Sequence, residues 1–231
     1  MYTLVLIRHG ESILNAKNLF TGWEDTDLSE KGILEAKRTG DVLRSNQFTF
    51  DIAFTSYLKR ASKTLEIILN EMKLNIPIHS SWRLNERHYG SFEGLNKDEV
   101  RKQYGEHQFE IWHRGYDVAP PPVSLDDSRY PGNDVKYKDV PKEELPQSES
   151  LKDVEARFMH YWIDAIVQEI KKNKRILIVA HNNTLRALIK NLDKISNEDI
   201  PSLSIITGVP LVYELDETLT PIRHFYLGEN I

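Results

Sequence analysis

Two histidines stand directly after the two most apolar stretches of the chain. Residues 4–7 run into Arg8 and His9, and residues 176–180 run into His181. Short continuous apolar runs bounded by turn-forming residues are typical of strands that are buried on both faces. In an open α/β sheet, ligands bind outside the carboxyl ends of the strands, so we expect both histidines at the functional edge.

Arg8 indicates what kind of ligand this edge receives. An arginine that directly follows a buried strand needs an anionic partner. One histidine alone is more often a satisfied, partly buried side chain than a reactive group, but two at equivalent strand ends favour a site. A neutral imidazole nitrogen is a nucleophile towards phosphorus, and arginines offset the charge on a transferring phosphoryl group. Covalent phosphoryl transfer is therefore the chemistry that we expect.

Other kinds of site have less support. The eight histidines include no His-x-x-x-His pair on an expected helix and the chain has no cysteine, so we expect no metal. The glycine-rich patterns that hold nucleotide phosphates are absent as well. A formal net charge of −5 argues against a nucleic-acid partner. A small anionic substrate remains compatible with that charge, because a cleft can concentrate a few cationic groups.

The elements that must position these residues alternate along the chain. Further strands are expected at residues 51–55, 211–215 and 222–227, and helices at residues 29–43, 58–72, 150–170 and 184–192. Ser150 and Asp153 form a helix-start capping pair, whereas Gly32 and Gly40 weaken the first helix. The alternation predicts an α/β fold, namely a three-layer sandwich with a mostly parallel sheet flanked by helices.

One region breaks this alternation. Six of the ten prolines fall within residues 120–146, and a long stretch without regular elements inside a compact domain is typical of a lid or binding loop. We therefore expect one domain over residues 1–231 with a lid-like insert at about 86–149. No apolar run reaches the length of a signal-peptide core or a membrane span, so the sequence predicts a cytoplasmic protein without a membrane partner.

Arg8-His9-Gly10-Glu11 is similar to the signature of the histidine phosphatase superfamily. A larger set of strings, which together cover almost the whole chain, resembles the 2,3-bisphosphoglycerate-dependent phosphoglycerate mutases of that superfamily. These strings are residues 8–12 with Asn15, 20–23, 55–56, 59–61, 84–90, Lys97, 129–130, 149–151, 185–187 and 207–215.

The resemblance implies a role for each matching residue. His9 would carry the phosphoryl group, Arg8 and Arg60 would bind it, and His181 would stabilise charge in the transition state. Glu86 would donate a proton to, and accept one from, the substrate hydroxyl. The other implied contacts with the substrate are Asn15, Thr21, Gly22, Tyr89, Lys97, His113, Arg114, Asn182 and Asn183.

The implied activity is the interconversion of 3-phosphoglycerate and 2-phosphoglycerate in glycolysis and gluconeogenesis. The enzyme would be primed by 2,3-bisphosphoglycerate, use no metal, and form a homodimer or homotetramer. Two alternatives stay open: a histidine phosphatase acting on small phosphomonoesters, and a catalytically silent module that binds a phospholigand. The string around Glu86 and the long insert favour the mutase over the phosphatase, and the complete set of reactive residues disfavours the silent module.

The chain departs from the mutase pattern at two site positions. The family usually has two adjacent arginines where this chain has His113 and Arg114, and histidine supplies no bidentate fork. The family usually has glycine at the position of Asn182, and asparagine tolerates the left-handed backbone region that glycine favours. Some relatives also continue beyond the position of Ile231 into a tail that closes over the site. Closure is therefore expected to depend on residues 120–146.

Overall fold

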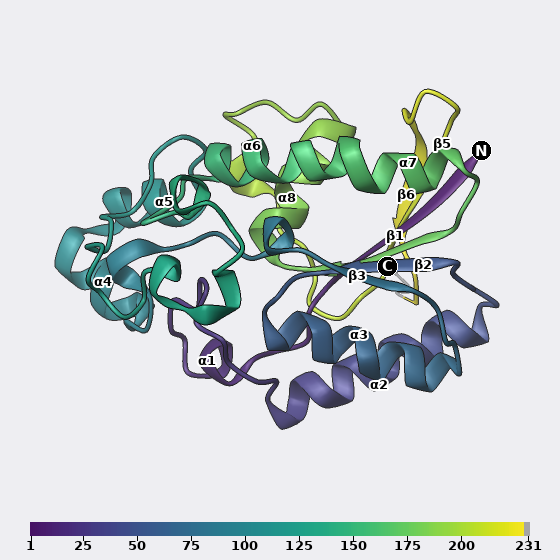
Figure 1. Ribbon diagram of the computed structural model, residues 1–231, viewed down its shortest axis with the longest axis horizontal. Helices are drawn as coiled ribbons and strands as arrows, with labels where there is room; N and C mark the ends of the chain where they lie inside the picture. Colours follow the sequence, from purple (N-terminus) through teal and green to yellow (C-terminus); the bar gives the residue numbers. More distant parts are fainter. Residues whose placement is uncertain (229–231) are drawn as a thin grey trace.

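A single mixed sheet of six strands forms the centre of the molecule, in the order β3-β2-β4-β1-β5-β6 (Figure 1). The computed structural model describes residues 1–228. The strands are β1 (Tyr2–Arg8), β2 (Ile52–Thr55), β3 (Ile78–Ser80), β4 (Ile176–Ala180), β5 (Leu211–Leu215) and β6 (Pro221–Tyr226). β3, β2, β4 and β1 are mutually parallel, and β5 is antiparallel to both of its neighbours. The expected mostly parallel sheet is therefore confirmed, with one reversed strand.

Helices cover both faces of this sheet. They are α1 (Ile13–Ala16), α2 (Glu30–Ser45), α3 (Lys59–Met72), α4 (Lys97–Tyr104), α5 (Glu106–Arg114), α6 (Leu151–Tyr161), α7 (Val167–Lys171) and α8 (Asn182–Leu192). In Figure 1, α2 and α3 lie below the sheet and α6, α7 and α8 lie above it. This is the three-layer α/β arrangement that the alternating sequence predicted.

The first strand shows why its sequence is apolar throughout. Val5 and Ile7 pack with α2 and α3 on one face, and Leu4 and Leu6 pack with α6, α7 and α8 on the other. Successive side chains of a strand point to opposite faces, so a strand between two helical layers needs apolar residues at every position.

Two glycines allow α2 to approach its neighbours closely. A Cβ atom on Gly32 would lie 2.0 Å from the carbonyl oxygen of Glu11, and one on Gly40 would lie 2.6 Å from the Cβ of Glu71 in α3. The sequence-based expectation that these glycines weaken the helix missed this role, because the contacts that require them are made by residues distant in the chain. Gly32 thereby seats α2 against the segment that follows β1, and Gly40 seats it against α3.

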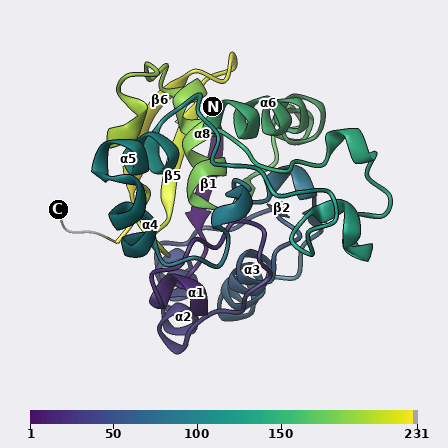
Figure 2. The same ribbon diagram turned by 90° about the vertical axis from the view of Figure 1, so that its left-hand side faces the viewer.

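The insert lies beyond the carboxyl ends of the parallel strands. Figure 2 looks onto this end, where α4 and α5 lie on one side of β1 and the teal-to-green segment 120–149 lies on the other. That segment contains only short 3₁₀ turns, at Pro131–Asn133, Val135–Tyr137 and Lys142–Glu144. It is nevertheless packed, because Tyr130 and Tyr137 are buried against Trp23 and Trp82.

The sequence did not predict β3, nor the helices α1, α4 and α5. All residues of β3 are exposed, so no apolar pattern marks this edge strand. The expected helix at 150–170 begins with a capping box at Ser150 and Asp153, and a π-helical turn at Trp162–Ile166 separates α6 from α7. Within the described residues, each helix is too short or too polar to cross a lipid bilayer. The end of the chain, on which the expectation about a closing tail falls, lies partly outside the described residues.

Candidate active site

A narrow cleft of about 60 Å³ opens where β1 ends. Every site residue expected from the sequence lines this cleft, except His181 and Arg114. The lining residues are Arg8, His9, Asn15, Leu19, Phe20, Thr21, Gly22, Arg60, Glu86, Tyr89, Lys97, His113, Asn182 and Asn183. Residues 120–146, which we expected to act as a lid, contribute none of them. The walls come instead from the end of β1 and the loop after it, from Arg60 of α3, from residues 86–113 of the insert and from the start of α8.

His9 is held as a neutral imidazole. Its side chain is buried, and its Nδ1 lies 2.7 Å from the carbonyl oxygen of Gly10. Since a carbonyl only accepts, Nδ1 carries the proton and Nε2 keeps its lone pair. The Nε of Arg60 donates to this Nε2 over 3.3 Å. Burial, and then the charges of Arg60 and Arg8, hold the pKa of His9 well below its usual value. The imidazole is therefore uncharged, as a nucleophile towards phosphorus must be.

Arg60 is fixed in place on the inner face of α3. It is only 1% exposed, so it is not an ordinary helix-surface arginine. Its Nη1 donates to the carbonyl of Glu24 over 2.9 Å and its Nη2 to that of Gly22 over 2.7 Å. Burial lowers the pKa of Arg60 to about 10, which still leaves it charged at neutral pH. A fixed positive group thus lies beside the reactive nitrogen.

Arg8 supplies a second positive group, and it does not use all of its hydrogen-bond donors within residues 1–228. Its Nη1 donates to the carbonyl of Ile205 over 3.0 Å. Its Nε is buried without a hydrogen-bond partner among residues 1–228. A buried donor without a partner is costly, and an anionic ligand in the cleft would remove that cost.

His181 lies behind His9. Pairing of β1 with β4 aligns Arg8 with Ala180, so the two histidines leave adjacent strands side by side, with ring centroids 4.9 Å apart. The Nε2 of His181 lies 2.7 Å from the hydroxyl of Ser56, and its Nδ1 has no partner in the described chain. Burial and the charge of Arg60 keep the pKa of His181 well below its usual value.

Glu86 presents one free carboxylate oxygen. Its Oε1 accepts from the backbone amides of Arg87 at 2.8 Å and Asn183 at 3.1 Å, while Oε2 accepts no hydrogen bond from the described protein atoms. Arg157 secures this segment by donating to the carbonyl of Glu86 over 2.9 Å, and is itself paired with buried Glu149 at 2.6 Å. Glu86 is therefore positioned to exchange a proton with a ligand in the cleft.

The far wall of the cleft contains the first substituted position, His113. Its ring packs against Phe20 with centroids 5.8 Å apart. Burial, followed by the charges of Lys97 and Arg87, lowers the pKa of His113 to about 2. This side chain is therefore uncharged at any working pH. Arg114, beside it, lies outside the cleft lining, and its backbone carbonyl accepts from Arg186 over 2.9 Å.

Asn182, the second substituted position, begins α8 and thus has helical backbone. This position therefore does not need the left-handed conformation that asparagine tolerates. Its Oδ1 is buried without a partner among the described residues, and its neighbour Asn183 donates from Nδ2 to the Tyr89 hydroxyl over 3.1 Å.

Positive charge exceeds negative charge around the cleft. Glu86 is the acidic residue in its lining. Three cationic side chains line the cleft with Glu86, namely Arg8, Arg60 and Lys97, and none of them forms an ion pair with a carboxylate of residues 1–228. Arg87, Arg114 and Arg186 lie outside the lining and have no such ion pair either. Arg87 and Arg186 are fully buried, and each has at least one nitrogen without a partner in the described chain. Such an excess suits a ligand with more than one anionic group.

Sequence reasoning missed several residues that shape this site. Ser56, Arg87, Arg157 and Arg186 contact or support the residues named above, but none received a role. Ser56 could have been found, because it directly follows an expected strand as His9 and His181 do. Arg87 and Arg186 lie inside the matching strings 84–90 and 185–187, but neither they nor Arg157 received a role, since charged residues on expected helices and loops are usually solvated. The described residues contain no group of three or more acidic and histidine side chains arranged to hold a metal.

The family model of the histidine phosphatase superfamily (branch 1) matches residues 4–218. The chain belongs to this superfamily. Its members are enzymes, so the cleft around His9 is a candidate active site.

Solved structures share the whole fold. The mycobacterial glucosyl-3-phosphoglycerate phosphatase has 21% sequence identity and a TM-score of 0.74 over 100% of both chains. Bacillus stearothermophilus YhfR has 26% identity and a TM-score of 0.72, covering 96% of this chain and 94% of its own. The alpha-ribazole phosphatase from Shigella flexneri has 23% identity and a TM-score of 0.70, covering 98% and 96%.

Proposed function

We propose that the protein is a 2,3-bisphosphoglycerate-dependent phosphoglycerate mutase that interconverts 3-phosphoglycerate and 2-phosphoglycerate. The observation that carries this proposal is the excess of cationic groups around a cleft whose lining contains one acidic residue, Glu86. A phosphoglycerate brings a carboxylate and a phosphate, and its bisphosphorylated form brings a second phosphate. A simple phosphomonoester would leave part of this positive charge without a partner.

The chain's own residues can divide the reaction between them. In the enzyme primed at His9, Glu86 takes the proton from the free hydroxyl of the phosphoglycerate as that oxygen attacks phosphorus and the phosphorus–nitrogen bond to His9 breaks, which forms 2,3-bisphosphoglycerate. Arg8 and Arg60 offset the charge on the phosphoryl oxygens, with His181 beside them. In the second half, the Nε2 of His9 forms a bond to the other phosphorus as its phosphorus–oxygen bond breaks, and Glu86 returns the proton to the departing oxygen. The product leaves and His9 carries a phosphoryl group again.

The second candidate is a phosphatase for small phosphomonoesters, in which water replaces the substrate hydroxyl in the second step. The names of two solved relatives favour it, because both are phosphatases. The identities of these two relatives are 21% and 23%, and at that level the likeness establishes the fold rather than the reaction. The residues of the cleft are compatible with either outcome, since both reactions share the phosphohistidine.

Product analysis separates these functions. The protein is incubated with 3-phosphoglycerate and a trace of 2,3-bisphosphoglycerate, and the products are followed by phosphorus NMR. We expect 2-phosphoglycerate with little inorganic phosphate. Stoichiometric inorganic phosphate would establish the phosphatase, and absence of any product would point to a binding module.

The reactive residue is tested by labelling. Incubation with ³²P-labelled 2,3-bisphosphoglycerate should give an acid-labile, alkali-stable phosphoprotein, and His9→Ala should abolish it. His160→Ala is the matched control, because His160 is an exposed histidine on α6. Label that survives in His9→Ala would overturn the assignment.

We further propose a cytoplasmic location and a homodimer or homotetramer, both of which the sequence resemblance implies. Light scattering of the purified protein measures the assembly directly, and a monomer across micromolar concentrations would contradict it.

A further inference from the structure

Three polar residues follow three adjacent parallel strands. In the sheet order β2-β4-β1, Ser56 follows β2, His181 follows β4 and His9 follows β1. Their side chains continue that order, with Ser56 bonded to His181 and the ring of His181 beside that of His9. Ser56 is buried and does not line the cleft, so any effect on a ligand must pass through His181.

The hydrogen bonds around Ser56 decide which nitrogen of His181 carries the proton. The Ser56 hydroxyl accepts from the backbone amide of Leu58 over 3.1 Å, and its other contact is the Nε2 of His181 at 2.7 Å. If Nε2 were protonated, the hydroxyl hydrogen would have no acceptor among the described residues, and Nδ1 would be a buried acceptor without a donor. If Nδ1 is protonated, the hydroxyl donates to Nε2 and the Nδ1 proton alone is unpaired. The second arrangement leaves fewer buried groups unsatisfied.

We propose that Ser56 is a positioning residue that holds His181 in the tautomer protonated at Nδ1, so that a hydrogen-bond donor rather than a lone pair is available to the phosphoryl group on His9. The effect of this tautomer on catalysis rests on the proposed phosphoryl transfer. The tautomer itself does not. Nε2 is occupied by Ser56, which leaves Nδ1 as the ring nitrogen for the ligand. A lone pair there would repel the phosphoryl oxygens, whereas an N–H stabilises them as charge develops.

The tautomer is measured by long-range ¹H–¹⁵N correlation spectra of histidine-labelled protein, with His181 assigned by comparison with His181→Gln. We expect the wild type to show a protonated Nδ1 and an unprotonated Nε2 at His181. Ser56→Ala should lose this single state, and Ser56→Thr, which keeps the hydroxyl, should retain it. The matched control is Thr55→Val, because Thr55 is an equally buried hydroxyl one residue away that bonds to the carbonyl of Val179 over 2.8 Å.

The rate of His9 phosphorylation supplies a second readout. Ser56→Ala should slow it about fivefold, the value of one neutral hydrogen bond, with the Michaelis constant of the donor unchanged because Ser56 does not reach the cleft. Thr55→Val should leave the rate unchanged, and Ser56→Thr should restore most of it.

A wild-type His181 protonated at Nε2, or a Ser56→Ala variant with an unchanged tautomer and rate, would overturn the inference. If the wild type transfers no phosphoryl group, the proposed function fails, but the spectra of the wild type still decide the tautomer. If Ser56→Ala does not fold, the wild-type spectrum and Ser56→Thr carry the test.

Discussion

Burial lowers the pKa of histidines and arginines alike at this site, and the chemical type of each side chain decides whether it keeps a charge. His9 and His181 are uncharged because burial and neighbouring arginines lower the pKa of each. Arg60 also has a pKa lowered by burial, to about 10, yet it stays protonated at neutral pH. The result is a cationic group fixed next to an uncharged nucleophile, as phosphoryl transfer requires.

His113→Arg tests the charge at the far wall. The pKa of His113 is lowered to about 2, so arginine adds a positive charge at every working pH and not only above neutrality. We expect the Michaelis constant for 3-phosphoglycerate to fall about tenfold, which is the value of one charge-assisted contact. The fall should be similar at every pH from 6 to 8. His113→Gln is the uncharged control. A Michaelis constant unchanged by the arginine would mean that position 113 does not reach the substrate.

The identity of the lining residues could be predicted from the sequence, but their protonation could not. His9, Arg60 and Glu86 lie in strings whose residue types are diagnostic together. The pKa of His113 is lowered first by burial and then by the charges of Lys97 and Arg87, which the fold brings near from other segments. No local pattern encodes that environment.

The two histidines are placed by the ends of strands, and Glu86 is held in a loop by a distant contact. β1 and β4 deliver the two histidines, and the segment carrying Glu86 is fixed by Arg157 of α6. The long buried strands and capped helices could be predicted because their signals are local and repeated. β3 could not, since its residues are exposed, and neither could the packing of residues 120–146, which depends on Trp23 and Trp82 from elsewhere in the chain.

Arg157→Met tests the contact that supports Glu86. The change leaves buried Glu149 without its cationic partner, and breaking a buried pair in this way costs about 3–5 kcal/mol. We expect a corresponding fall in the free energy of unfolding, measured by urea titration, and a loss of activity as the segment around Glu86 loosens. Arg223→Met is the control, because the Arg223–Glu214 pair is exposed and such pairs contribute about 1 kcal/mol or less. Equal losses in the two variants would contradict the supporting role of Arg157.

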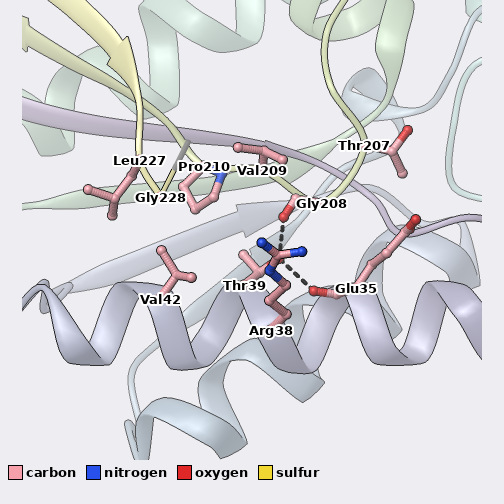
Figure 3. A pocket seen from close by; sticks show the side chains of 10 residues that line it. All are labelled: Glu35, Arg38, Thr39, Val42, Thr207, Gly208, Val209, Pro210, Leu227 and Gly228. Carbon is pink, nitrogen blue, oxygen red and sulfur yellow. Dashed lines mark hydrogen bonds between the residues drawn. The ribbon is translucent and has the colours of Figure 1, made fainter. Parts of the chain in front are cut away.

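A hydroxyl on α2 supports Arg8 from outside the cleft. Figure 3 shows a second hollow, where the hydroxyl of Thr39 bonds to the carbonyl oxygens of Glu35 and Gly208. Gly208 in turn donates its amide to the carbonyl of Arg8 over 3.0 Å. The same loop supplies Ile205, whose carbonyl accepts from the Arg8 side chain.

Thr39→Val removes the first link of this chain of contacts. We expect a loss of about 1 kcal/mol in the free energy of unfolding and a higher Michaelis constant, because Arg8 is less firmly held. Thr39→Ser keeps the hydroxyl and should behave as the wild type. Weakened substrate binding in the serine variant as well would assign the effect to packing instead.

For the molecule as a whole, buried histidines make the fold sensitive to acid. Burial lowers the pKa of His9, His88, His113 and His181, so on unfolding below about pH 6.5 each takes up a proton. Glu93 acts in the opposite sense, because burial raises its pKa to about 8. On unfolding at a pH above the pKa that it has in the unfolded chain, Glu93 releases its proton. The histidines outnumber it, so stability must fall as the pH is lowered.

The slope of that loss can be measured. If unfolding near pH 5 is accompanied by a net uptake of about three protons, the free energy of unfolding changes by about 4 kcal/mol per pH unit. Urea titrations between pH 5 and pH 6.5 check this value. His88→Gln should reduce the slope by the contribution of about one proton. His160→Gln should leave it unchanged, because His160 is exposed. A flat profile would show that the buried histidines are already protonated in the folded state.

The unpaired cations around the cleft also bear on how the protein is handled. Any anion that binds the folded state alone stabilises it by mass action, by about 2.7 kcal/mol at one hundred times its dissociation constant. We therefore expect inorganic phosphate or sulfate in a buffer to stabilise the folded protein and to compete with the substrate at the same time. A storage buffer for this enzyme should be rich in such anions, and an assay buffer should be free of them.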